Sequence, residues 1–527
     1  MTTVVSRPAA TPVTDTRRGQ DRRAAKFAAL LVVPYLVFGL VWVFSNPPGA
    51  APDEADHLIK SLAAGRLDIG VKYQGPPIAP GPVGERNVSI SRDMKIPGNL
   101  APDGYSCTAF NPEQTAACLP SNPPTDSHLV VRTSAVGAYP VFGYVPMGIA
   151  ARFATTPGGA YHFARLVSLL MAVALLFAGA WHLIRWLGRW AVLGLVVGLT
   201  PMAVFASASV STSGLEIMSA VVLGAIVIVA SRDPSSLADT RTLALAAIAA
   251  SALVLSRQLG IVTLAVLATI VLVRGGWPVI WQQLRARRRA AIAAVATVGT
   301  SVVAVALWEM KFDHPNQTGT PFSKEAIRWF VDLGYHYIDS GVGNFGWQDT
   351  SLPGWAIGLW VVVATVVCGA AIVVGKRSDR WSISTILLAT VAVAYVTQSI
   401  IFTPVQAGLQ GRHMLPLFVT APMLAGVVLV ERLRAVGLDD AVARLFVFVA
   451  VSMAGLQLLG IFVNGRRYAV GAHGHLFFVD APDWSPQLGW WPWLLLSLVA
   501  AGWLAIVTIR SGHAVALISE EPTHVER

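Results

Sequence analysis

Charged residues are scarce in this sequence, and the shortage excludes most soluble folds. Only 13% of the 527 residues are charged, whereas soluble domains carry about 25%. The three cysteines show no metal-type spacing, and no internal repeat is evident. A transporter holds its substrate with ionisable groups near the centres of its spans. The centres of these apolar runs are nearly free of such groups, which argues against a transporter.

Hydrophobic residues are abundant instead, at 54% of the chain with a mean hydropathy of +0.59. Runs of roughly 20 apolar residues recur, each long enough to cross a hydrocarbon core about 30 Å thick. We therefore predict an all-α polytopic membrane protein with twelve transmembrane helices. The runs 242–256 and 259–273 are short and could form one broken pair. The twelve runs lie near 27–45, 163–183, 190–208, 215–230, 242–256, 259–273, 290–309, 355–374, 382–402, 414–430, 445–463 and 489–509.

Basic residues gather in alternate connections between these runs. If the N-terminus is inside, the inside segments include the arginines at 17–23, the run RARRR at 285–289, GKRSDR at 375–380 and ERLR at 431–434. This positive-inside bias predicts an N-in, C-in topology. It also explains the net charge of +10 without a nucleic-acid partner. The first run could be a cleaved secretory signal, but its length and the eleven runs after it favour an uncleaved span.

This topology divides the chain into one transmembrane domain with three large extracytoplasmic loops. The first loop is rich in proline, and its Cys107 and Cys118 are predicted to form a disulfide on an oxidising face. Its apolar stretch 139–153 is short and broken by Pro146, so we expect a helix on the membrane surface. The predicted divisions are a disordered basic tail at 1–26, the domain at 27–510, the loops 46–162, 311–353 and 464–488, and a tail at 511–527.

The informative polar residues lie at the predicted outer ends of the spans. The first loop opens with Asp53, Glu54, Asp56 and His57, which could be a helix start, a metal site or a catalytic base. Arginine forks match phosphate geometry, and aromatic rings suit sugars and apolar chains. Together they indicate a site for an anionic, lipid-linked substrate. The other candidates are Glu216, Arg257, Trp347, Gln410, Arg412, Arg466, Arg467 and Tyr468.

Each of these residues also has a structural explanation. An arginine beside a span end can be an anchor that reaches the interface, and Glu216 can simply begin a helix. Asp56 and His57 are weak candidates for metal ligands. On a helix they would lie one turn after Asp53, so the three side chains could share a face and bind a hard divalent cation. Grouping on one predicted face is what favours a functional site.

Six segments, in order, resemble a bacterial membrane family, domain-of-unknown-function family 2142. The resemblance covers roughly residues 27–510, and the family in turn resembles the GT-C superfamily of membrane glycosyltransferases. This chain has Ser211-Thr212-Ser213 where the family has Asn-Pro before Gly-Leu-Glu, and His413 where tyrosine is usual. The segments are PPGAAPDEADH, TPMAVFASASVSTSGLE, SRQLG, GNFGWQDTSLP, LQGRHMLPLFV and NGRRYAVG.

The resemblance implies transfer of a sugar from a polyprenyl-phosphate carrier to a cell-envelope glycan, lipid or protein on the outer face of a bacterial plasma membrane. Asp53 and Glu54 match the acidic motif after the first span, and Glu216 matches a second acidic position. Because phosphate is a good leaving group, one carboxylate suffices as base for an inverting displacement, and no cofactor is required. The alternatives are a transporter or flippase for lipid-linked glycans and a non-catalytic scaffold.

Overall fold

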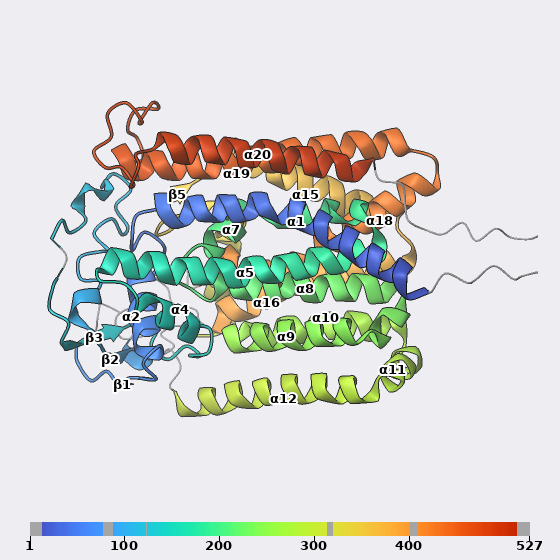
Figure 1. The fold of residues 1–527 in the computed structure, drawn as a ribbon, viewed down its shortest axis with the longest axis horizontal. Coiled ribbons are helices and arrows are strands. Elements are labelled where there is room, and N and C mark those ends of the chain that lie inside the picture. The colour runs from blue at the N-terminus through green and yellow to red at the C-terminus, as the bar shows by residue number, and fades with distance from the viewer. Residues whose placement is uncertain (1–12, 77–87, 123, 313–319, 401–408, 514–527) are drawn as a thin grey trace, which may run out of the picture.

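The computed structural model describes residues 13–76, 88–122, 124–312, 320–400 and 409–513. Long apolar helices form a bundle (Figure 1), as expected where backbone groups must find hydrogen-bond partners without water. The helices of the bundle are α1 (Val13–Ser45), α5 (Pro157–Leu187), α6 (Leu193–Gly198), α7 (Pro201–Ser207), α8 (Ser213–Arg232), α9 (Thr240–Ser256), α10 (Leu259–Gly275), α11 (Trp277–Ala286), α12 (Arg288–Lys311), α15 (Gly354–Val374), α16 (Arg377–Ile400), α17 (Leu415–Phe418), α18 (Thr420–Ala435), α19 (Asp439–Val470) and α20 (Trp491–Gly512).

The predicted spans correspond to helices, although their number is not fixed at twelve. Within the described residues, nine helices are long and apolar enough to cross a membrane, and two bent pairs raise the number to eleven. One pair bends by 82° between residues 198 and 201, and the other by 102° between α10 and α11. Helix α9, from 240 to 256, is apolar but shorter than these nine helices. The protein is therefore a multi-pass membrane protein, and twelve spans remains a prediction.

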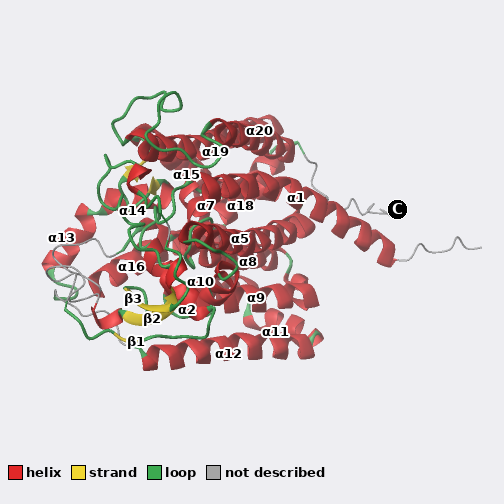
Figure 2. Ribbon diagram, turned by 60° about the vertical axis from the view of Figure 1, so that its left-hand side comes forward, coloured by secondary structure: helices red, strands yellow, loops and turns green. Residues whose placement is uncertain are grey.

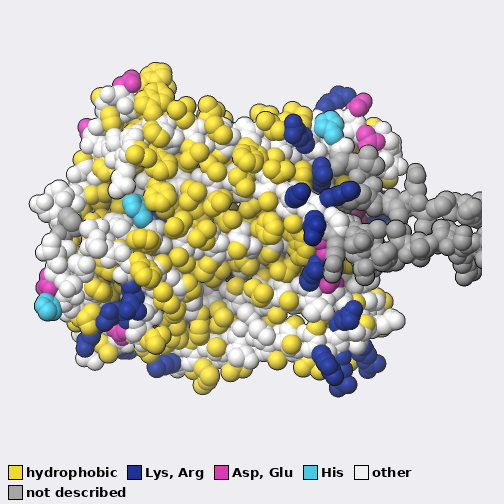
Figure 3. All heavy atoms as spheres, in the orientation of Figure 1, with side chains coloured by type: hydrophobic (Ala, Val, Ile, Leu, Met, Phe, Trp, Pro, Cys, Tyr) yellow, Lys and Arg dark blue, Asp and Glu magenta, His cyan; other side chains and the backbone are white. Residues whose placement is uncertain are grey.

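One end of the bundle carries most of the non-spanning structure, and we name it the capped end. Figures 1 and 2 show α2, α4 and three short strands there, whereas α1 begins and α20 ends at the opposite, terminal end. Lysine and arginine side chains form a band at the terminal end (Figure 3). The elements of the capped end are α2 (Glu54–Ala64), β1 (Val71–Lys72), β2 (Arg92–Pro97), β3 (Leu129–Ser134), α4 (Tyr144–Ala151), α13 (Lys324–Asp332), α14 (Gly334–Val342), β4 (Asn344–Phe345) and β5 (Thr350–Ser351).

The strands correct the all-α prediction for the first loop. β1, β2 and β3 form an antiparallel sheet in that order, with Arg92 opposite Ser134 and Pro97 opposite Leu129. Side chains in β2 alternate, so Met94 and Ile96 are buried against α2. The sheet therefore gives α2 a second packing surface besides the bundle.

Helix α4 replaces the surface helix predicted over 139–153. Its eight residues span about 12 Å, far short of a membrane crossing. It lies directly on α2 because Gly148 has no side chain: a Cβ there would be 1.7 Å from the Ser61 carbonyl oxygen. Helix α2 is thus held between α4, the sheet and α5.

Several predicted boundaries change. Helix α1 begins at Val13 and α5 at Pro157, so helix replaces parts of the predicted tail and first loop. Residues 1–12 and 514–527, and with them most of the predicted tails, lie outside the described residues.

Candidate functional site

Asp53 occupies the turn that joins α1 to α2, in an unusual backbone conformation. Its φ of 56° and ψ of 18° are left-handed, which aspartate tolerates better than most residues but which still costs energy. Its side chain forms no capping hydrogen bond with α2. The helix therefore positions Asp53 without using its carboxylate.

The turn keeps this conformation because its backbone is held from two distant segments. The indole N–H of Trp347 donates a 3.2 Å hydrogen bond to the Gly49 carbonyl oxygen, and the Tyr468 hydroxyl donates one of 3.1 Å to that of Ala50. Gly49 has a φ of 77°, and a Cβ there would be 2.2 Å from the Tyr105 carbonyl oxygen. Trp347 and Tyr468, predicted to bind substrate, are buried against this turn.

Glu54, next to Asp53, is fully buried in an ion pair with Arg165 of α5. Arg165 Nε lies 2.8 Å from Glu54 Oε1, and Nη2 lies 2.6 Å from Oε2. Glu54 also accepts hydrogen bonds from the amides of Val210 (3.0 Å) and Ala51 (3.3 Å). All of these contacts leave the Glu54 carboxylate bound within the protein.

Arg165 itself fixes the chain ahead of the acidic motif. It donates to the carbonyl oxygens of Asn46 and Pro47, both at 2.7 Å. Sequence reasoning missed this residue, because a single arginine at the start of an apolar run resembles an interfacial anchor. The missed signal is that a charge in a spanning segment needs a partner.

Two arginines from other parts of the chain act on Asp53. Arg257 lies in the turn between α9 and α10, and Arg412 lies in the short 3₁₀ turn 411–413 before α17. Burial raises the pKa of the Asp53 carboxyl above its usual range, and the Arg412 and Arg257 guanidinium groups oppose that rise. Burial, together with the neighbouring Arg257, lowers the pKa of Arg412 to about 10.

These three charges are brought together without being neutralised by direct contact. Within the described part of the chain, none of Asp53, Arg257 and Arg412 takes part in an ion pair of 4 Å or less. The Nε atoms of both arginines are buried and lack a hydrogen-bond partner. Buried donors rarely remain unpaired in folded proteins, so this arrangement is suited to an anionic ligand.

Glu216 and the ring of Tyr139 surround Arg257. Glu216 lies in the first turn of α8, is buried, and interacts electrostatically with Arg257, while its Oε1 has no hydrogen-bond partner. The Arg257 guanidinium lies 5.7 Å from the centre of the Tyr139 ring. The predicted second carboxylate thus belongs to the same cluster, which we call the Asp53 cluster: Asp53, Glu216, Arg257 and Arg412.

Asp56 and His57 are bound within the protein. The Asp56 carboxylate accepts a 2.7 Å hydrogen bond from the Ala135 amide, and burial raises its pKa to about 7. His57 Nδ1 lies 2.9 Å from the Tyr144 hydroxyl. Burial and the nearby Arg257 and Arg412 lower the pKa of His57 well below its usual value, so the ring is neutral. In the described residues, no group of three His, Cys, Asp or Glu side chains is arranged to hold a metal ion.

The remaining predicted phosphate ligands have structural partners. Arg467 is buried, donates to the carbonyl oxygens of Thr108, Asn111 and Gln114, and pairs with Asp349 at 3.0 Å. Arg467 therefore fastens the loop closed by the Cys107–Cys118 disulfide. Arg466 donates to the Gly474 carbonyl oxygen at 2.9 Å. The backbone N–H of Gln410 donates to His413 Nδ1 at 3.4 Å, and the Gln410 side chain accepts from the His413 backbone N–H. Their role toward substrate stays a prediction.

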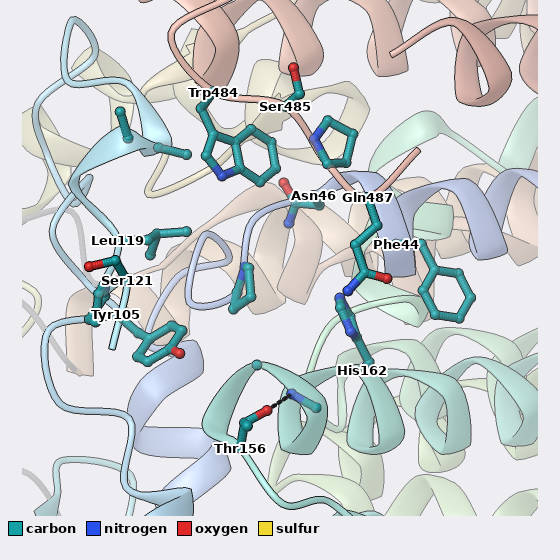
Figure 4. Close-up of a pocket in the computed structure, with 17 residues that line it drawn as sticks. Phe44, Asn46, Tyr105, Leu119, Ser121, Thr156, His162, Trp484, Ser485 and Gln487 are labelled. Atoms are coloured by element: carbon teal, nitrogen blue, oxygen red, sulfur yellow. Dashed lines mark hydrogen bonds between the residues drawn. The ribbon is translucent and has the colours of Figure 1, made fainter. Parts of the chain in front are cut away.

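A pocket of about 490 Å³ opens beside the segment that leads to Asp53 (Figure 4). It lies between the end of α1, the start of α5 and the chain before α20. Figure 4 shows His162, Gln487 and Trp484 from these segments around Asn46. Aromatic and amide side chains of this kind suit the faces and hydroxyl groups of sugars.

The helical spans and the capped end define a multi-pass membrane protein, and the Asp53 cluster is a partly buried group of charges at its capped end. Residues 36–421 match the family described as "Predicted membrane protein (DUF2142)". The chain belongs to this family, as its motifs predicted.

Comparison with other proteins adds a distant likeness of fold. No curated protein matches the chain. Among solved structures, ArnT from Cupriavidus metallidurans in the apo state aligns with a TM-score of 0.44 and 13% identity, over 93% of this chain and 77% of that one. Similarity at this level says nothing about the chemistry of either site.

Proposed function

We propose that this protein is a GT-C-type membrane glycosyltransferase that moves a sugar from a polyprenyl-phosphate donor to a cell-envelope acceptor. The observation that carries the proposal is the Asp53 cluster: two carboxylates and two arginines held together without direct ion pairs. The family resemblance of the surrounding motifs supports the same class. The band of basic residues at the terminal end (Figure 3) supports an outward-facing capped end under the positive-inside rule.

In the proposed reaction, Asp53 is the general base. Its carboxylate takes the proton from the acceptor hydroxyl as that oxygen attacks the anomeric carbon of the donor. The bond from that carbon to the phosphate oxygen breaks, and the polyprenyl phosphate leaves with the bonding electron pair. Attack from the face opposite the leaving group inverts the anomeric centre.

Arg257 and Arg412 bind the phosphate in this scheme. Their guanidinium groups stabilise the negative charge that grows on the departing phosphate. Glu216 positions Arg257 through its charge. Glu54 is assigned no proton transfer, because Arg165 and two amides already bind its carboxylate. The pocket beside Asn46 is the candidate place for the sugar part of the acceptor.

The test has two parts. Glycan analysis of the cell envelope with and without the gene names the product. Purified protein in lipid vesicles is then given the corresponding polyprenyl-phosphate sugar, and release of polyprenyl phosphate is measured. Asp53→Asn is expected to lower the rate of release by about 10²- to 10⁴-fold. Asp103→Asn, which changes an exposed carboxylate paired with Arg132 in the same loop, should keep the parent rate. Full transfer by a correctly inserted Asp53→Asn protein would exclude the base assignment.

A further inference from the structure

Four cations at the terminal end line a groove between α1 and α20. Arg23 and Lys26 lie one turn apart on α1, Arg189 follows α5, and Arg510 is in the last turn of α20. All four side chains are exposed. The groove has a volume of about 770 Å³. It is far from the capped end, because α1 begins and α20 ends on the opposite side of the bundle (Figure 1).

These cations have no acidic partner among the described residues. The nearby carboxylate of Asp21 is bound to Arg185 and Arg241, at 2.7 and 2.5 Å. The contact recorded for Arg189 is with the ring of Phe27, 4.6 Å from its centre. Four positive groups of this kind repel one another, so a bound anion would stabilise the groove.

The rest of the groove is apolar and faces outward from the bundle. Exposed fractions are 46% for Leu30, 63% for Val499 and 52% for Ile506. Phe27 and Trp503 complete the wall. Such a surface is stable against hydrocarbon chains but costly in water. An occupant must therefore carry a negative group at one end and an apolar chain behind it.

We propose that the groove binds an anionic phospholipid of the leaflet at the terminal end. The phosphate contacts Arg23, Lys26, Arg189 and Arg510, and one acyl chain lies along Leu30, Val499 and Ile506. Basic pockets beside transmembrane helices are suited to such headgroups. Each arginine presents a planar fork to phosphate oxygens, while Lys26 adds a point charge.

The test measures lipid retention by the purified full-length protein. The protein is placed in phosphatidylcholine nanodiscs with increasing phosphatidylglycerol, and bound lipid is counted by native mass spectrometry after release. We expect phosphatidylglycerol to be retained over phosphatidylcholine. The variant Arg189→Gln/Arg510→Gln should bind it at least ~10-fold more weakly, because two of four charges are lost. Arg189→Lys/Arg510→Lys should stay near the parent value.

Arg289→Gln/Arg444→Gln is the matched control. Both residues are exposed arginines near the starts of α12 and α19 and do not line the groove. This variant lowers the net charge by the same amount as Arg189→Gln/Arg510→Gln. It should still bind phosphatidylglycerol as the parent does. Equal loss in the control would show a diffuse charge effect and overturn the site. Equal retention of phosphatidylglycerol and phosphatidylcholine would also overturn it. So would glycerol phosphate that displaces phosphatidylglycerol as well as phosphatidylglycerol itself does, because the acyl chain would then play no part.

Discussion

The two ends of the bundle use partly buried arginines in opposite ways. At the terminal end, Arg232 of α8 pairs with Asp379 and Glu431, and Arg274 of α10 also pairs with Asp379. At the capped end, Arg257 and Arg412 approach Asp53 without a direct ion pair. Paired charges hold helices together, whereas charges kept apart are available to a ligand. The contrast between Asp53 and Glu54 repeats this difference within two adjacent residues.

The largest effect is expected for Asp53→Asn. A general base contributes about 10²- to 10⁴-fold to rate, so transfer should fall by that much. Folding raises the pKa of Asp53, so its ionised form is disfavoured in the folded state at neutral pH. Stability in thermal denaturation should therefore be unchanged or increased. A variant that unfolds readily would show that Asp53 is structural, like Glu54.

Glu54→Gln should act on stability instead. The change leaves the buried Arg165 without its counter-charge, and breaking one partner of a buried pair costs about 3–5 kcal/mol. Thermal or denaturant unfolding in detergent measures the loss. Asp379→Asn at the terminal end is the matched variant, since it leaves Arg274 without its carboxylate partner. A stable Glu54→Gln protein that is inactive would reassign the base to Glu54.

Arg412→Lys tests the phosphate assignment with the charge retained. Lysine cannot form the two parallel hydrogen bonds of a guanidinium fork, so transfer should fall roughly 10- to 100-fold. Arg467→Lys is the comparison, because Nη1 and Nη2 of Arg467 donate to carbonyl oxygens of the disulfide loop. If Arg467→Lys lost transfer while keeping its stability, a direct phosphate role for Arg467 would be favoured.

The pH dependence of transfer separates the arginines from the base. Asp53 must be ionised to accept a proton, so activity should fall as pH decreases through its raised pKa. Arg257 opposes that rise, and its removal should raise the pKa further. Arg257→Gln should therefore move the acid limb of the rate profile to higher pH. If the acid limb of the rate profile did not move, a group other than Asp53 would control it.

The smallest effect is expected at the exposed pair of Arg132 and Asp103. Both side chains are well exposed, at 37% and 57%, so Arg132→Gln should change stability by less than about 1 kcal/mol. Activity should not change. A loss comparable to that of Glu54→Gln would contradict the distinction between surface and buried pairs.

Much of this architecture could be predicted from the sequence. Long apolar runs and basic connections are local signals, and they located the helices and the grouping of Asp53, Arg257 and Arg412 at one end. The sheet was missed because its strands are two to six residues long and lie in a proline-rich loop. Strand pairing between Arg92 and Ser134 depends on contacts that no local pattern records.

The roles of individual residues were harder to predict for the same reason. The sequence predicts that Trp347 and Tyr468 contact substrate, because aromatic residues near a charged motif suit sugars. In the structure both side chains donate to carbonyl oxygens, 298 and 418 residues away, and contact with substrate stays a prediction. Likewise, nothing local distinguishes Arg412 from Arg467, and only the folded chain shows that the two terminal nitrogens of Arg467 are bound.

The contacts of α19 also set the order in which the site can be assembled during synthesis. Tyr468 binds a turn 418 residues earlier, and Arg467 binds the Gln114 carbonyl 353 residues earlier. At translation rates of about 5–20 residues per second, this interval is on the order of 20–80 s. The first loop must therefore wait, without its final supports, until α19 is made. A chain ending before Arg466 would retain most spans but would lack the Tyr468 hydrogen bond to the turn before Asp53.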